Sequence, residues 1–170
     1  NDIKNMTDHI DLLINCAGIL GDMNKNLGDD LDFDEIMRVI NVNAIGTLRV
    51  TNALSSLVLN STEKTIVNIS SEAGSIADCE RTGWFGYCMS KAANNMQSAL
   101  VHNNIRKLGG KVFAIHPGHV ATYMRGHLDT TAKITPDVSA EGILHVVLDM
   151  PHPINSRPLY LDYTGKELPW

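Results

Sequence analysis

Three short apolar runs constrain the fold of this chain more than any other feature of its sequence. They cover residues 11–15, 64–69 and 111–115, and each has consecutive aliphatic or aromatic residues at its centre. Short continuous runs of this kind are typical of strands that are buried on both faces of a parallel sheet. Small or polar residues follow each run directly, as expected where a strand ends in a loop. We therefore predict three strands of a parallel sheet.

The segments that separate these strands are predicted to be helical. Residues 32–59 carry apolar side chains at mixed three- and four-residue steps, and Asp32 or Asp34 is suited to cap the helix. Residues 85–107 also have helix-forming character, and the glycine at Gly109 is a typical stop. Both helices are therefore long enough to cross a face of the sheet.

Weaker patterns complete the expected chain. We expect the end of a helix within residues 1–9, a short helix near 140–148 and a last strand at 158–161. Strands that alternate with helices imply right-handed βαβ crossovers. The predicted fold class is α/β, a partial Rossmann-type doubly wound parallel sheet in a single domain.

Charge and hydropathy exclude several kinds of partner. The net charge of −5 comes without a long basic patch, so a nucleic acid or an acidic membrane has no electrostatic footprint to bind. No apolar run approaches the roughly 18–20 residues that span a bilayer. We therefore expect neither a nucleic-acid partner nor a membrane partner.

The cysteines favour a reducing compartment, and the histidines give no pattern of a metal centre. Cys16, Cys79 and Cys88 form no CxxC pair, which favours free thiols and a cytoplasmic location. His116 and His119 alone have a spacing that could chelate, and no HExxH motif is present. We predict no metal site.

Tyr87 and Lys91 are four residues apart in a predicted helix, so their side chains lie on one face, a turn from each other. A phenol with a reference pKa near 10 is a poor acid or base at neutral pH unless a nearby positive charge favours the phenolate. Lys91 is placed to supply that charge. Taken alone, the spacing is equally compatible with an exposed helix face.

The residues that follow the strands strengthen the case for a site. They are Asn15–Gly18 after the first strand, Ser70 and Ser71 after the second, and Pro117–Gly118 with Thr122 after the third. Ligands of open parallel sheets bind at the carboxyl ends of the strands. Each cluster alone is compatible with a turn, but together they predict one cleft.

In order and spacing, these residues resemble the short-chain dehydrogenase/reductase family from Asp11 to Thr122. Asn15-Cys16-Ala17-Gly18 is similar to the NNAG motif of that family, with Cys16 in place of the second asparagine, and Asn43 matches its helix asparagine. Ser71 matches the catalytic serine, Tyr87 and Lys91 match the YxxxK pair, and Pro117–Gly118 with Thr122 matches the PG segment.

The resemblance implies a role for each matched residue. Tyr87 would exchange a proton with the carbonyl or alcohol oxygen, and Ser71 would hydrogen-bond that oxygen. Lys91 would lower the pKa of Tyr87 and hold the nicotinamide ribose, and Asn43 would support a water that relays protons to Lys91. Thr122 would bind the carboxamide. The implied NAD or NADP contacts are Asn15, Ala17, Gly18, Tyr87, Lys91, Pro117, Gly118, Val120 and Thr122.

The resemblance also implies that a part of the family's domain is missing. Family members begin with a strand, a TGxxxGxG loop and a helix that faces the pyrophosphate, and this segment is not among the 170 residues. We therefore expect an N-terminally truncated member, with residues 1–170 as the C-terminal part of one dinucleotide-binding catalytic domain. The residues that select NAD or NADP would lie in the missing part.

Without its usual neighbour, the strand at 11–15 is expected to be an exposed apolar edge, which favours aggregation. We therefore predict that residues 1–170 alone are neither a stable nor an active monomer. The segments 116–124 and 162–170 resemble the C-factor-like branch of the family, and this leads us to expect the natural C-terminus.

Three functions are compatible with this reading. The first is an NAD(P)-dependent oxidoreductase acting on a small carbonyl or alcohol, with an apolar pocket for which the candidates are Trp84, Phe85, His119, Tyr123 and Met124. The second is a non-enzymatic fragment in C-factor-like cell-cell signalling or interaction. The third is a pseudoenzyme, which the intact set of four catalytic matches argues against. In the family, the two long helices pack between subunits, so we expect a homodimer or homotetramer.

Overall fold

The computed structural model describes residues 2–150 and 157–170 and contains one four-stranded sheet. Its strands are β1 (Leu12–Asn15), β2 (Thr65–Ile69), β3 (Lys111–His116) and β4 (Leu159–Asp162). Neighbours pair in parallel in the order β1-β2-β3-β4. Every predicted strand is confirmed to within one residue at each end.

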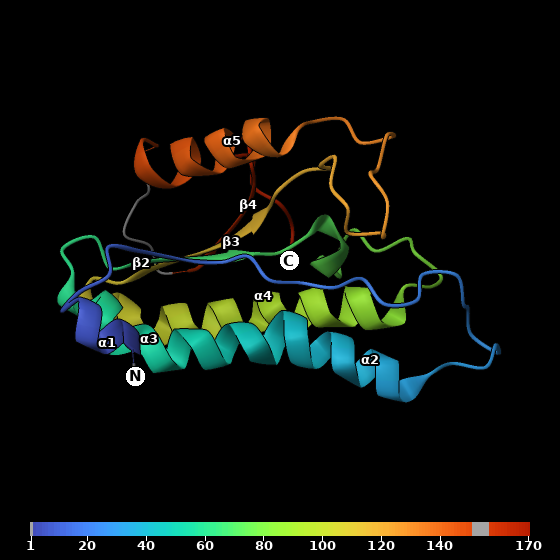
Figure 1. Cartoon of the computed structure of the whole chain (residues 1–170), viewed down its shortest axis with the longest axis horizontal. Helices are drawn as coiled ribbons and strands as arrows, with labels where there is room; N and C mark the ends of the chain where they lie inside the picture. Colours follow the sequence, from blue (N-terminus) through green and yellow to red (C-terminus); the bar gives the residue numbers. More distant parts are fainter. Residues whose placement is uncertain (1, 151–156) are drawn as a thin grey trace.

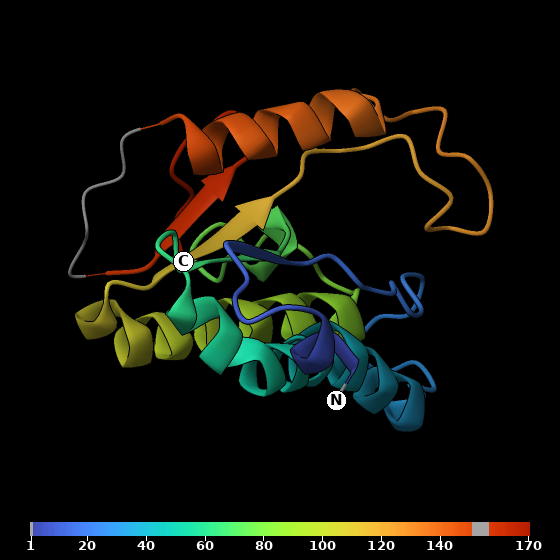
Figure 2. The same ribbon diagram turned by 60° about the vertical axis from the view of Figure 1, so that its left-hand side comes forward.

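Helices cover both faces of this sheet, as Figure 1 shows. α3 (Thr47–Asn60) and α4 (Phe85–Ile105) lie side by side on one face, and α5 (Pro136–Leu148) lies on the other. The turned view in Figure 2 shows the same three layers. Alternation along the strands divides the core, because Ile66 and Val112 pack with Val58 on the α3 and α4 side while Val67 and Phe113 pack toward α5. The doubly wound fold class is confirmed.

The first long helix contains a change of geometry that the sequence did not predict. Asp32 caps α2 (Phe33–Ile40) by accepting a hydrogen bond from the Glu35 amide at 3.0 Å. The chain then passes through a π-helical segment, Asn41–Gly46, before α3 begins. The predicted extent of 32–59 is therefore correct, but one helix is three consecutive segments. π-helical turns are rare and are frequent at functional sites, and this one carries Asn43.

The other helices agree with the predictions apart from their ends. α4 ends at Ile105 and continues as a 3-10 turn before Gly109, whose φ of 84° gives the expected stop. α5 begins at Pro136, earlier than expected, because Thr135 caps it and proline suits the first helical position. α1 is a short helix at Asp2–Met6.

The two edges of the sheet differ. Among the described residues, β1 pairs with β2 alone, and Ile14 at this edge is 42% exposed. The outer side of β4 is covered because the chain turns back along it, with the Leu168 amide donating to the Tyr160 carbonyl at 2.8 Å. The exposed apolar edge expected at residues 11–15 is therefore present.

In residues 2–150 and 157–170, no helix is both long and apolar enough to cross a membrane. Within those same ranges, His, Cys, Asp and Glu side chains form no group of three or more that could hold a metal ion.

Candidate active site

The predicted catalytic residues meet at the carboxyl end of β2. Ser71 follows this strand by two residues, while Tyr87 and Lys91 lie on the first turns of α4. The Lys91 ammonium donates to the carbonyl of Ile69, the last residue of β2, at 2.8 Å. The start of α4 is thus fixed against the strand end where ligands bind in parallel sheets.

Ser71 and Tyr87 are each only 8% exposed, and the Ser71 side chain lies close enough to Tyr87 to lower the pKa of its phenol. Ser71 has an extended backbone and caps the 3-10 helix Glu72–Gly74, its Oγ accepting from the Ala73 amide at 3.2 Å. This cap fixes where the hydroxyl points. The sequence predicted that these two hydroxyls share one cleft, and the structure brings them together.

Several groups shift the pKa of Tyr87. Burial raises the pKa of this phenol, and Cys88 and Glu72 raise it further, while the Ser71 side chain and the charge of Arg81 lower it. That Lys91 also lowers the pKa of Tyr87 stays a prediction.

Lys91 has a perturbed pKa of its own. Its side chain is 4% exposed, and burial lowers the pKa of the ammonium from its ordinary value to about 8. Removal of water disfavours the charged form, so the Lys91 ammonium gives up its proton more readily than that of an exposed lysine. Its Nζ lies 5.7 Å from the centroid of the Tyr87 ring.

Asn43 joins the π-helical segment to the loop after β1. Its Oδ1 accepts from the Ile19 amide, and its Nδ2 donates to the Ile19 carbonyl, both at 2.8 Å. Nδ2 also donates to Ser90 Oγ at 2.9 Å. Gly18 lies beside this clamp, since a Cβ at this position would come within 3.4 Å of Asn43 Oδ1 and 3.8 Å of Lys91 Nζ. The loop therefore passes close to the lysine, with Ala17 exposed next to Gly18.

Asn15 has a structural position that was not expected. Its Nδ2 donates to Thr51 Oγ1 at 3.1 Å and to Asn68 Oδ1 at 2.8 Å, which uses both amide hydrogens to tie β1 to α3 and β2. A contact between this residue and a cofactor would have to use its other polar atoms.

The loop after β3 is held in one conformation by specific contacts. The Pro117 carbonyl accepts from Ser139 Oγ of α5 at 2.6 Å. Gly118 has a φ of 85°, and a Cβ there would lie 2.7 Å from Ile134, so the position requires glycine. Val120 forms an isolated bridge with Ile134.

Asp129 folds the same loop back on the segment that carries Thr122. Its amide donates to the Thr122 carbonyl at 3.0 Å. Its carboxylate contacts His119 at 2.9 Å and Thr131, and these hydrogen bonds hold the pKa of the carboxyl well below its usual range. Met124 connects the loop to the site, because its Cε lies 3.8 Å from the Cβ position of Gly18.

A buried polar network under the site was missed from the sequence. Ser70 Oγ donates to Asn95 Oδ1 at 2.5 Å, and Asn95 Nδ2 donates to the Gly74 carbonyl at 3.2 Å. The hydroxyl of Tyr160, from β4, donates to the Ser71 carbonyl at 2.5 Å. One signal was available, because α4 has uncharged polar residues at positions that an amphipathic helix would fill with apolar ones.

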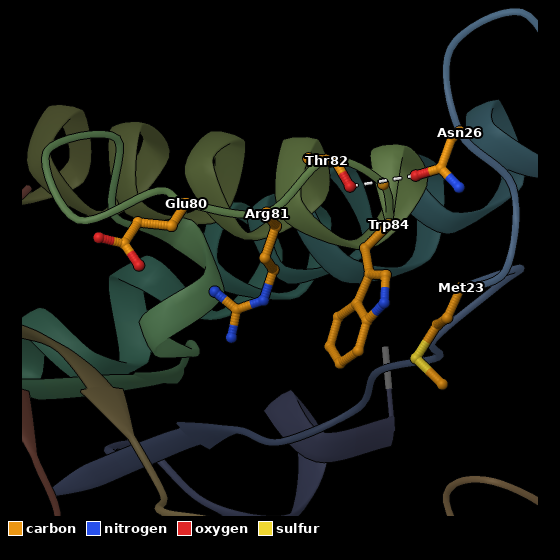
Figure 3. Close-up of a pocket in the computed structure, with 7 residues that line it drawn as sticks. Met23, Asn26, Glu80, Arg81, Thr82 and Trp84 are labelled. Atoms are coloured by element: carbon orange, nitrogen blue, oxygen red, sulfur yellow. Dashed lines mark hydrogen bonds between the residues drawn. The ribbon is translucent and has the colours of Figure 1, made fainter.

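The rim of the site is formed by the loop before α4, shown in Figure 3. Arg81 pairs with Glu72 at 2.5 Å, and its guanidinium lies 5.2 Å from the centroid of the Trp84 ring. Trp84 in turn makes an edge contact with Tyr87, with ring centroids 6.4 Å apart. A hollow of about 320 Å³ opens here, lined by Met23, Asn26, Glu80, Arg81, Thr82, Gly83 and Trp84. Of the five predicted pocket residues, Trp84 lines this hollow, and Phe85, His119, Tyr123 and Met124 do not.

Comparison of the sequence with known proteins finds one matching family model and several relatives. A sequence model of short chain dehydrogenases matches residues 1–133. The C-signal of Myxococcus xanthus is 37% identical over 164 residues, which cover 96% of this chain and 95% of that protein. A 1-hydroxy-2-glutathionyl-2-methyl-3-butene dehydrogenase of Rhodococcus is 33% identical over 141 residues, which cover 82% of this chain but 61% of the enzyme.

Solved structures agree with the sequence relatives. The NADPH-bound carbonyl reductase from chicken fatty liver superposes with a TM-score of 0.84 at 29% identity, over 99% of this chain and 69% of that one. The carbonyl reductase Sniffer of D. melanogaster superposes with a TM-score of 0.87 at 21% identity, a likeness of fold. Both are longer than this chain, as the Rhodococcus enzyme is.

Proposed function

Because the chain belongs to the short chain dehydrogenase family, we propose that it is an NAD(P)-dependent oxidoreductase acting on a small carbonyl or alcohol substrate. The observation that carries this proposal is the burial of Ser71 and Tyr87 beside each other at the end of β2, with Lys91 one helical turn away and bonded to the Ile69 carbonyl. Residues 1–170 would act as the C-terminal part of one dinucleotide-binding catalytic domain, in the cytoplasm.

The residues at the strand ends fit the nicotinamide end of such a cofactor. The Lys91 ammonium carries three hydrogens and uses one for the Ile69 carbonyl, which leaves donors for ribose hydroxyls. Gly18 has no side chain to fill the space beside this ammonium. Val120 and Thr122 would hold the carboxamide. When bound, the nicotinamide would supply or accept the hydride.

The protonation state of Tyr87 suits one direction of the reaction. A tyrosine phenol is protonated at neutral pH, and burial raises the pKa of Tyr87 further, so Tyr87 is suited to donate a proton to a carbonyl oxygen. Ser71 would donate a hydrogen bond to the same oxygen as negative charge develops there. We therefore expect carbonyl reduction to dominate near neutral pH, and alcohol oxidation to gain as rising pH favours the phenolate.

The direct test is the oxidation of NADPH or NADH by the protein, with whatever residues precede Asn1 in its gene, against a panel of aldehydes and ketones. Tyr87→Phe removes the acidic hydroxyl and should lower kcat by about 10²–10⁴-fold. Thr65→Val is the matched control, because it removes a buried hydroxyl at the opposite end of β2. Undiminished turnover in Tyr87→Phe would remove the acid-base role.

A second candidate is a non-enzymatic signalling or interaction fragment, which the likeness to the Myxococcus C-signal favours. This candidate predicts that no carbonyl compound in the panel stimulates cofactor oxidation. It also predicts that Tyr87→Phe leaves binding to any protein partner unchanged. Loss of both activities in that variant would link signalling to the catalytic residues.

We also propose that the protein is a homodimer or homotetramer that buries the outer faces of α3 and α4. Met89, Met96 and Leu100 are exposed on α4 at spacings that place them on one face, and Leu48 is exposed on α3. Sedimentation equilibrium would measure the assembly. Met96→Glu should dissociate it, and an unchanged mass in that variant would argue against this face.

A further inference from the structure

Tyr160 occupies an unusual position for a tyrosine in a core strand. Its side chain is completely buried in β4, and its hydroxyl donates to the main-chain carbonyl of Ser71 at 2.5 Å. The same carbonyl accepts a second hydrogen bond from the Gly74 amide at 2.9 Å. The backbone of the candidate catalytic serine is therefore held by donors from two different parts of the chain.

The Tyr160 hydroxyl also joins the network that reaches α4. Gly74, whose amide shares the Ser71 carbonyl with Tyr160, accepts from Asn95 Nδ2 at 3.2 Å, and Asn95 Oδ1 accepts from Ser70. Asn95 lies one turn beyond Lys91 on the same helix. One hydroxyl thus connects β4 to both elements that carry the catalytic candidates, the end of β2 and the start of α4.

The segment that follows β4 braces the Tyr160 side chain. The Trp170 ring packs against the Tyr160 ring with centroids 5.1 Å apart, and the Trp170 carbonyl accepts from the Ala77 amide at 3.1 Å. The Leu168 amide pairs with the Tyr160 carbonyl. Residues 168–170 therefore link the strand to the loop after Ser71 and restrict the movement of both.

From these contacts we propose that Tyr160 is a positioning residue that acts through Ser71, holding the serine hydroxyl against Tyr87, and that residues 168–170 brace it. This inference rests on the proposed oxidoreductase function. Tyr160 is fully buried and its hydroxyl donates to the Ser71 main chain, so it does not touch the substrate. Its importance comes from geometry, since a misplacement of about 1 Å in a catalytic group can cost about a hundredfold in rate.

A double-mutant cycle tests this inference in the complete protein. Tyr160→Phe should lower kcat about ten- to a hundredfold, with the Kd for the cofactor unchanged, because Ser71 is displaced while the cofactor contacts stay. In a Ser71→Ala background, Tyr160→Phe should have no further effect on kcat. Equal losses in both backgrounds would mean that Tyr160 does not act through the serine, and would overturn the proposal.

Thr65→Val controls for the loss of a buried hydroxyl. Thr65 Oγ1 donates to the Glu63 carbonyl at 2.9 Å on the same strand as Ser71 but at its far end. This variant should lose stability without losing kcat. Trp170→Ala is a second variant that leaves Tyr160 itself intact, and it should reproduce the Tyr160→Phe defect in weaker form. A Trp170→Ala protein with full kcat would overturn the bracing role.

A readout without turnover separates this inference from the proposed function. With ¹³Cζ-labelled tyrosine, the NMR signal of Tyr87 can be assigned with Tyr87→Phe and titrated. Since the Ser71 side chain lowers the pKa of Tyr87, both Ser71→Ala and Tyr160→Phe should raise it, and Thr65→Val should not. If no carbonyl supports cofactor oxidation, the proposed function fails, yet this titration still decides the role of Tyr160. An unchanged Tyr87 titration in Tyr160→Phe would overturn it.

Discussion

The two edges of the sheet differ in how completely their strands are paired. At the β4 edge, the returning chain pairs with the strand, and Tyr160 reaches from it to the carbonyl of Ser71. At the β1 edge, Ile14 is exposed, and β2 is the one partner of β1 among the described residues. The corner that we propose to be catalytic is therefore held by contacts from β4, whereas the strand that leads into the proposed cofactor loop is paired on one side among the described residues. We propose that residues 1–170 carry the residues for the chemistry and for the nicotinamide end of the cofactor, but not those that would bind its pyrophosphate.

The largest effect is expected at the completed corner, from Lys91→Met. Burial lowers the pKa of Lys91 to about 8, so the folded protein holds this charge at a cost. Removal should abolish most carbonyl reduction and yet stabilise the fold, by on the order of 1–3 kcal/mol at pH 7. Chemical denaturation measures the gain. Lys107→Met, at an exposed position, is the control and should change stability by less than about 0.5 kcal/mol.

Lys91 also makes the free energy of unfolding depend on pH, and the sign of this dependence follows from its lowered pKa. Between pH 8 and the ordinary lysine value near 10.4, the unfolded chain binds more protons than the folded one, so stability rises with pH across this window. In Lys91→Met, this contribution should disappear. The same slope between pH 8 and pH 10 in the wild type and in Lys91→Met would contradict the buried, destabilised ammonium, because Tyr87, Cys88 and Tyr160 affect both proteins alike.

A smaller effect is expected at the open edge, from Ile14→Lys. A charged side chain on an edge strand opposes edge-to-edge pairing, so aggregation of residues 1–170 through this edge should decrease, while the proposed α3 and α4 interface and the free energy of unfolding change little. Light scattering over a range of concentrations measures this. Ile76→Lys changes an exposed isoleucine outside the sheet and should leave association unaltered. Equal behaviour of the two variants would show that the β1 edge is not the associating surface.

The smallest effect is expected at the rim. Arg81 lowers the pKa of Tyr87 and Glu72 raises it, so Arg81→Gln and Glu72→Gln should move the pH profile of the reaction in opposite directions, upward and downward respectively. Both side chains are partly exposed, so each should change kcat by less than about tenfold. Shifts of the same sign in both variants would exclude a purely electrostatic effect.

Much of this site was predictable because strand ends are visible in the sequence. The continuous apolar run that ends at Ile69 placed Ser71 at a carboxyl edge, and the four-residue step placed Tyr87 and Lys91 on one helix face. Parallel topology then brings these residues together without further information. The family motifs pointed to the same residues.

The features that were missed depend on tertiary packing. The π-helical turn at Asn43 has no strong local signal, and Asn15 points inward because Thr51 and Asn68 happen to lie beneath it. The pKa of Tyr87 is raised because the folded chain removes water from it, which residue spacing does not report. Tyr160 was unremarkable in the sequence, since a tyrosine in a strand is ordinary packing.

The most direct test of our proposal on cofactor binding is a titration of residues 1–170 with NADPH and, separately, with reduced nicotinamide mononucleotide. A pyrophosphate and adenosine add affinity when a glycine-rich loop and a helix N-terminus receive them. We expect the two ligands to bind with Kd values within a factor of about ten of each other. A Kd for NADPH at least a hundredfold lower than that for reduced nicotinamide mononucleotide would contradict the proposal that residues 1–170 do not bind the pyrophosphate.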